Sequence, residues 1–206
     1  MRHTSLAVAG HRAWTVFLWL GATVASAACG ASPSTPTSSI PRKLLLEARP
    51  IGAGPRFHPP PSGPVLGPCR AQLGPRFGVH LEVFAANRVV LVPGGIGTAP
   101  PRSWAAGRLS RARCYGSLVT VDPTGVVLIR PGLHLTVADL FRSWGEPLTA
   151  SRVASFTTDR AVIAFVDGRP WRRAPGSVPL TRHAEIVVEV GPRVPPHTSY
   201  TFPRGD

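Results

Sequence analysis

The chain has 206 residues, of which 43% are hydrophobic, 16% are charged and 7% are aromatic. It contains 21 glycines and 24 prolines. This composition excludes a coiled coil or a helical bundle and favours short strands joined by many turns. The length allows one ordinary domain with appendages.

The formal net charge is +13, from 23 basic and 10 acidic side chains. Lys43 is the only lysine, and the arginines are scattered as singles and pairs rather than gathered in a basic run. A phosphate-binding stripe needs clustered charge, so we expect no nucleic-acid partner. A basic exterior instead favours an anionic membrane or an envelope polymer as the partner.

The N-terminus has the layout of a secretory signal peptide over residues 1–28. Arg2 and Arg12 provide the basic region, an apolar run covers residues 13–25, and small residues follow. The run is shorter than the roughly 20 apolar residues of a membrane span. An uncleaved membrane anchor remains as an alternative.

The segment 26–29, Ser-Ala-Ala-Cys, resembles the bacterial lipobox, although Ser26 replaces the usual aliphatic residue. The resemblance implies that Cys29 becomes the first residue after cleavage and receives a diacylglycerol. We therefore expect lipid anchoring at the extracytoplasmic face of the cell membrane. The alternative is ordinary cleavage near Ala28, which would release a secreted protein.

Residues 29–68 are expected to form a tether behind the lipidated cysteine. Residues 30–39 are rich in Ser, Thr and Pro, and Pro59-Pro60-Pro61 favours an extended conformation. Periodic structure begins near Phe77, so the folded β-rich module is expected over residues 69–206.

If Cys29 is acylated, Cys69 and Cys114 remain as an even pair in an oxidising compartment. A disulfide between them is expected to stabilise the module by about 3–4 kcal/mol. The alternative is two buried free thiols. Neither cysteine belongs to a CxxC pair, which argues against a metal site there.

Apolar and β-branched runs predict two hairpins and two later strands. The second hairpin turns at Asp122-Pro123-Thr124-Gly125, which suits a type I turn. The predicted strands cover residues 79–84, 88–92, 118–121, 126–129, 161–166 and 185–190.

One helix is predicted over about residues 136–144. Thr136 is the expected N-cap with Asp139 as its capping-box partner, and Gly145 ends the helix. One face is apolar, formed by Val137, Leu140, Phe141 and Trp144. The fold class is therefore α+β, mainly β: a small antiparallel sheet built of hairpins with one packed helix.

The order of these segments resembles an uncharacterised family of membrane-tethered extracytoplasmic proteins of high-GC bacteria. The family pattern runs HxHAHL, VPxxIGI, LHTHDxTG, FTLGQFFxxWG, VNG, AEIxLxVG and YTFP. The matching pieces here are residues 79–84, 92–97, 114–127, 135–145, 166–168, 184–191 and 199–205.

The family's histidines look like a metal site, because alternate strand positions share one face. Here most of them are replaced: only His80 remains in the first cluster, and Val119 and Val121 replace both histidines of the second. We therefore expect no bound metal, with His80 and Asp122 as the candidate ligands if there is one. The other histidines of the module show no ligand spacing.

No catalytic residue is assigned, because the sequence contains no nucleophile, zinc-protease or phosphate-binding motif. Glu82, Asp122 and Glu185 are the acidic residues considered for a carboxylate pair. The expected function is a non-enzymatic envelope module, without a cofactor, that binds an envelope polymer or a protein. The alternatives are an extracytoplasmic metal-binding protein and a hydrolase with an unmarked site.

Overall fold

The computed structural model describes residues 48–203 and 205 of the chain. The expected signal peptide over 1–28, the lipidation site Cys29 and residues 29–47 of the expected tether lie outside the described residues. Within the described part, no helix combines the length and hydropathy that crossing a membrane requires.

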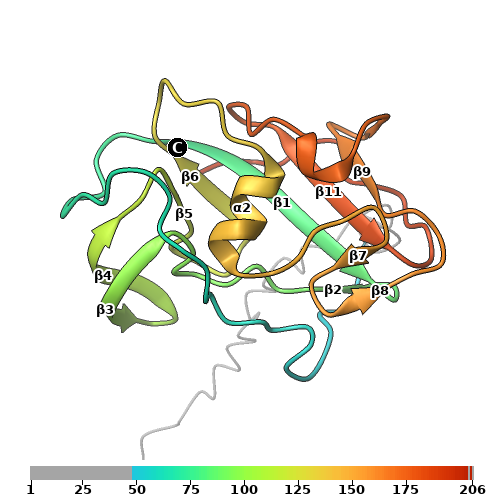
Figure 1. The fold of residues 1–206 in the computed structure, drawn as a ribbon, viewed down its shortest axis with the longest axis horizontal. Coiled ribbons are helices and arrows are strands. Elements are labelled where there is room, and N and C mark those ends of the chain that lie inside the picture. The colour runs from blue at the N-terminus through green and yellow to red at the C-terminus, as the bar shows by residue number, and fades with distance from the viewer. Residues whose placement is uncertain (1–47, 204, 206) are drawn as a thin grey trace, which may run out of the picture. The chain divides into compact units, whose positions relative to one another are not determined.

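The main sheet has seven strands in the order β10-β9-β11-β1-β6-β5, with β2 paired to β1 (Figure 1). Its central strands, β1 and β11, are buried on both faces, although one face carries the polar side chains of His80, Glu185 and Glu189. The strands are β1 Phe77–Ala85, β2 Arg88–Val89, β5 Leu118–Val119, β6 Val126–Ile129, β9 Ile163–Val166, β10 Arg169–Trp171 and β11 Glu185–Val190.

Both predicted hairpins form, β1 with β2 and β5 with β6. Ala86 and Asn87 turn the first hairpin with φ values of 51° and 62°, the left-handed conformation that matches strand twist. The α+β, mainly β class is confirmed. The sheet is mixed rather than purely antiparallel, because β1 and β11 pair in parallel. The two strands are far apart in the sequence, so no turn motif next to them predicts the pairing.

Two smaller ladders were not predicted from the sequence. The first joins β3 Thr98–Ala105 to β4 Arg108–Tyr115, and the second joins β7 Arg152–Val153 to β8 Phe156–Thr157. In β3, the register shifts between Ala99 and Arg102, so Pro100 and Pro101 are left out of the ladder. Prolines argue against a strand, which is why the sequence did not predict β3. A 3-10 helix, η1 Pro175–Ser177, precedes β11.

Helix α2, Val137–Trp144, forms where the sequence predicts it. The backbone N–H of Thr136 donates to Asp139 Oδ2 at 2.9 Å, and Gly145 ends the helix with a φ of 90°. Its apolar face is fully buried against the sheet and forms the main core with Leu81 and Ile186 (Figure 1). One sheet face is therefore dry and packed by the helix.

The opposite face is covered by the C-terminal segment after β11, residues 191–203. Val194 packs on Phe84 and Val187, while Tyr200 joins a second apolar cluster with Val126 and Leu128. The sheet is thus sandwiched between α2 on one side and this segment, the C-terminal tail, on the other.

The module begins earlier than residue 69. The backbone N–H of Gly52 donates to Val89 O at 2.9 Å, and that of Leu91 donates to Phe57 O at 2.8 Å. The N–H groups of Ser62 and Gly63 both donate to Trp144 O, and a Cβ at Gly63 would overlap the backbone at the end of α2. The boundary predicted at residue 69 therefore needs correction, since residues 50–68 pair with the fold despite their Pro/Gly-rich composition.

Candidate functional site

A group of ionisable side chains lies on the sheet face beneath the C-terminal tail. His80 and Glu82 are two residues apart on β1, so they share that face. The parallel register places Glu185 of β11 directly beside His80. Ligand atoms of these three residues all lie within 4.8 Å of one another.

His80 is hydrogen-bonded through both ring nitrogens. Nδ1 lies 2.6 Å from Glu185 Oε2, and Nε2 lies 2.9 Å from the Thr124 carbonyl oxygen. A carbonyl oxygen only accepts, so Nε2 must be the donor in that bond. The Nδ1–Oε2 contact therefore holds one proton, shared between imidazole and carboxylate.

Burial raises the pKa of Glu185, and the hydrogen bond from His80 partly opposes that effect. Glu185 is 1% exposed, and its second oxygen, Oε1, has no hydrogen-bond partner among the described residues. The charged form of this carboxylate is therefore costly, and the proton shared with His80 is what relieves that cost.

A second histidine–glutamate pair continues the group toward the tail. His197 Nδ1 lies 2.7 Å from Glu82 Oε2 and 2.9 Å from Oε1. Tyr200, three residues later, stacks on His80 with ring centroids 3.8 Å apart and planes inclined by 11°. The C-terminal tail thus covers the histidine–glutamate group through His197 and Tyr200.

The structure separates the two sequence-predicted ligands. His80 joins Glu82 and Glu185, whereas Asp122 pairs with Arg108 at the molecular surface. The expectation that His80 and Asp122 would form the ligand pair therefore needs correction, because the acidic residues next to His80 are Glu82 and Glu185. His197 was missed because it lies in a Pro-rich tail whose path over the sheet has no sequence signal.

One imidazole and two carboxylates are a donor set that can hold a divalent metal. In this arrangement, however, His80 Nδ1 and Glu185 Oε2 are as close as a hydrogen bond, so a metal would have to displace the shared proton and separate them. A pocket of about 160 Å³ reaches His80 and Glu82. That volume is below the roughly 300–1,000 Å³ of small-molecule sites, so it fits an ion better than an organic substrate.

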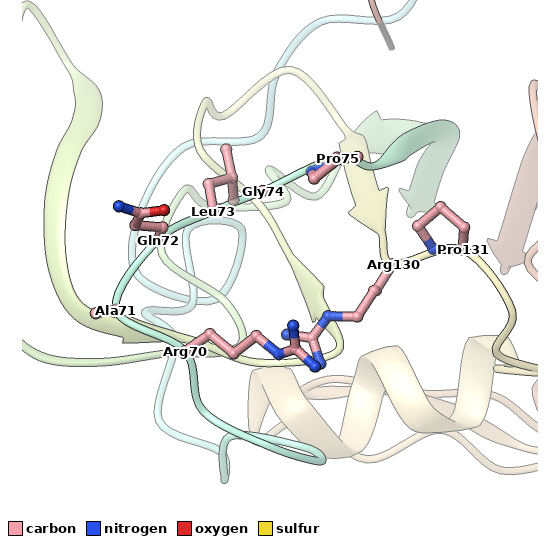
Figure 2. A pocket seen from close by; sticks show the side chains of 8 residues that line it. All are labelled: Arg70, Ala71, Gln72, Leu73, Gly74, Pro75, Arg130 and Pro131. Atoms are coloured by element: carbon pink, nitrogen blue, oxygen red, sulfur yellow. The ribbon is translucent and has the colours of Figure 1, made fainter.

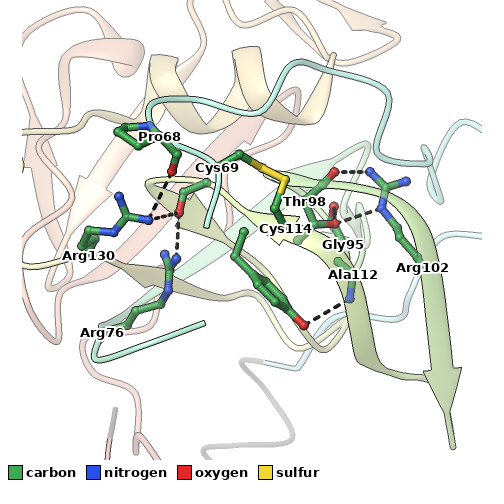
Figure 3. Close-up of a disulfide and its surroundings, with 11 residues drawn as sticks. Pro68, Cys69, Arg76, Gly95, Thr98, Arg102, Ala112, Cys114 and Arg130 are labelled. Carbon is green, nitrogen blue, oxygen red and sulfur yellow. Dashed lines mark hydrogen bonds between the residues drawn. A yellow bond between two sulfur atoms is a disulfide. The ribbon is translucent and has the colours of Figure 1, made fainter. Parts of the chain in front are cut away.

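The disulfide between Cys69 and Cys114 is present, with Cα atoms 5.3 Å apart (Figure 3). It joins the segment before β1 to the end of β4. Next to it, Arg70 and Tyr115 exchange two backbone hydrogen bonds of 3.0 and 2.7 Å. The disulfide is consistent with an extracellular protein, since disulfides persist in oxidising compartments.

Comparison of the chain with protein-family models, curated proteins and solved structures finds no match in any of the three.

Proposed function

We propose that the chain is an exported, lipid-anchored protein of the cell envelope whose folded module binds an envelope polymer or a protein. The observation that carries this proposal is the Cys69–Cys114 disulfide, which leaves Cys29 as the one remaining cysteine. A disulfide indicates an oxidising compartment, and the apolar leader directly before Cys29 supplies the route to it.

A binding role is supported over catalysis by the enclosure of the histidine–glutamate group. His80 is only 6% exposed, both its nitrogens are engaged, and Tyr200 stacks on its ring. A general base must reach the proton that it abstracts. Both nitrogens of His80 are already hydrogen-bonded, which supports a structural role that joins β1, β11 and the turn at Thr124.

Detergent phase partition of cells expressing the chain tests the anchoring. We expect wild type in the detergent phase and Cys29→Ser in the aqueous phase, because the substitution removes the acylated thiol. A Cys69→Ser/Cys114→Ser variant, which keeps Cys29, is the matched control and should stay in the detergent phase. Unchanged partition of Cys29→Ser contradicts the proposal.

Metal binding is the second candidate, favoured by the convergence of His80, Glu82 and Glu185 within 4.8 Å. A ligand that prefers the folded state raises its melting temperature. If the group binds zinc, wild type should show a saturable zinc-induced shift that His80→Ala abolishes and His134→Ala, at an exposed position, retains. A shift equal in all three chains rejects this candidate.

A further inference from the structure

A cavity of about 680 Å³ lies next to the disulfide, since Arg70 in its wall directly follows Cys69 (Figure 2). Its walls are the loop of residues 70–75 and residues 130–131, which follow β6. The volume lies within the range of small-molecule sites. Two of the lining residues are arginines, Arg70 and Arg130, and none is acidic.

Arg70 and Arg130 line the same cavity from two segments of the chain, the loop before β1 and the residues after β6 (Figure 2). Arg130 Nη2 is held by the carbonyl oxygens of Gly116 and Pro68, at 3.3 and 3.4 Å. Arg70 is exposed, and within the described residues its guanidinium makes no hydrogen bond or ion pair. Two like charges that line one cavity favour an anion between them.

A third guanidinium, that of Arg76, lies next to Arg130. Arg76 is 8% exposed and donates to four carbonyl oxygens, those of Leu73, Gly116, Ser117 and Leu128. Arg76 and Arg130 share the Gly116 oxygen (Figure 3). Burial and the neighbouring Arg130 lower the pKa of Arg76 to about 10, so it remains a cation at neutral pH.

No carboxylate of the described residues forms an ion pair with any of these three arginines; the described ion pairs of the chain lie elsewhere. Among the described residues, the positive charges of Arg76 and Arg130 are therefore compensated by carbonyl dipoles alone. The backbone at Arg70 is held by the neighbouring disulfide at Cys69 and by two backbone hydrogen bonds to Tyr115. This part of the cavity wall is therefore in place before an anion binds, which lowers the cost of binding.

We propose that this cavity binds a phosphate group through Arg70 and Arg130, with the neighbouring Arg76 adding positive potential. Guanidinium forks match phosphate oxygens bidentately, and a tetrahedral phosphate accepts such forks from two directions at once. The inference deepens the proposed function, on which it rests for its cellular setting, because it assigns the chemical class that the module binds.

Titration with inorganic phosphate and with glycerol 3-phosphate, at constant ionic strength set with chloride, tests the site in the full chain purified in detergent. We expect saturable binding by calorimetry and a matching rise in melting temperature. Arg70→Gln should weaken binding by about tenfold or more, since it removes a charge-assisted contact. Because Arg70 is exposed, the melting temperature of the Arg70→Gln variant in chloride should equal that of wild type. A loss of binding can then be distinguished from a loss of folding.

The Arg172→Gln/Arg173→Gln variant is the matched control for the double variant Arg70→Gln/Arg130→Gln. Both double variants lose two positive charges, but Arg172 and Arg173 follow β10 at the opposite edge of the sheet. The control should bind phosphate like wild type. Equal loss in both variants, or no saturable phosphate binding in wild type, overturns the proposal.

Vesicles of phosphatidylglycerol, with phosphatidylcholine as reference, distinguish the source of the phosphate. Binding of both soluble phosphate and phosphatidylglycerol supports the site with a lipid headgroup as ligand, and binding of soluble phosphate alone supports it with a free phosphate. Binding of vesicles alone overturns it, because general surface charge then suffices. Phosphate binding does not require Cys29, so failure here and failure of lipid anchoring are separate results.

Discussion

Two buried glutamates on β11, Glu185 and Glu189, distinguish the sheet face beneath the tail from an ordinary apolar face. Each is 1% exposed, and burial raises the pKa of both. They differ in what compensates them. Glu185 shares a proton with His80, whereas neither carboxylate oxygen of Glu189 has a hydrogen-bond partner among the described residues, and the charges of Arg193 and Arg49 favour its charged form.

The raised pKa of Glu189 predicts a stability that falls as pH rises. Above the ordinary value of 4.5 and up to the raised value, the folded state binds more protons than the unfolded chain. The contribution is therefore full at low pH and is lost as pH rises through the folded-state pKa. Glu189→Gln should reduce this loss. The free energy of unfolding of the variant, relative to that of wild type, should therefore be higher at about pH 8 than at about pH 4.5.

Urea unfolding of both chains across that pH range measures the effect. Asp159→Asn controls for the loss of one negative charge, because Asp159 is exposed. Since Glu185 has a raised pKa as well, some pH dependence should remain in Glu189→Gln. A pH profile identical to that of wild type would show that Glu189 does not contribute.

At the level of elements, the packing of α2 against the sheet depends strongly on Trp144. This side chain is 0% exposed, and its Nε1–H donates to the Pro59 carbonyl at 3.0 Å. Trp144→Ala should cost about 3–5 kcal/mol in the free energy of unfolding, through lost burial and an unfilled cavity. Trp104→Ala, on exposed β3, should cost less than about 1 kcal/mol in the same denaturant titration. A cost below about 1 kcal/mol for Trp144→Ala would contradict its place in the core.

The elements that the sequence predicts are those whose signals are local. The helix follows from a cap, an apolar spacing and a terminal glycine within ten residues, and the two hairpins follow from turns between β-branched runs. The β3–β4 hairpin was missed because Pro100 and Pro101 interrupt it and its turn residues, Ala106 and Gly107, are a weak turn signal.

The candidate site was less predictable than the fold because it depends on non-local pairing. His80 meets Glu185, 105 residues later, only through the parallel register of β1 and β11. His197 reaches Glu82 through a tail without regular secondary structure. Residue type therefore suggested ionisable groups on strands, but only the topology decides which of them meet.

For the molecule as a whole, two long-range connections close the fold: the tail, which covers one sheet face, and the disulfide, which fixes the segment before β1. The disulfide joins residues 45 positions apart and lies next to the arginine-lined cavity. Its effect should therefore extend from global stability to the position of Arg70, which follows Cys69 directly.

Replacing both cysteines, Cys69→Ser/Cys114→Ser, should lower the free energy of unfolding by about 3–4 kcal/mol, because a closed loop of this length restricts the unfolded chain. Wild type treated with a reductant should reach the same denaturant midpoint as the variant, which controls for the change of side chain. The variant should also bind inorganic phosphate more weakly, since Arg70 then keeps only its backbone bonds to Tyr115. Thiols in wild type that alkylate without prior reduction, or a midpoint unchanged in the variant, would show that this bond does not stabilise the protein.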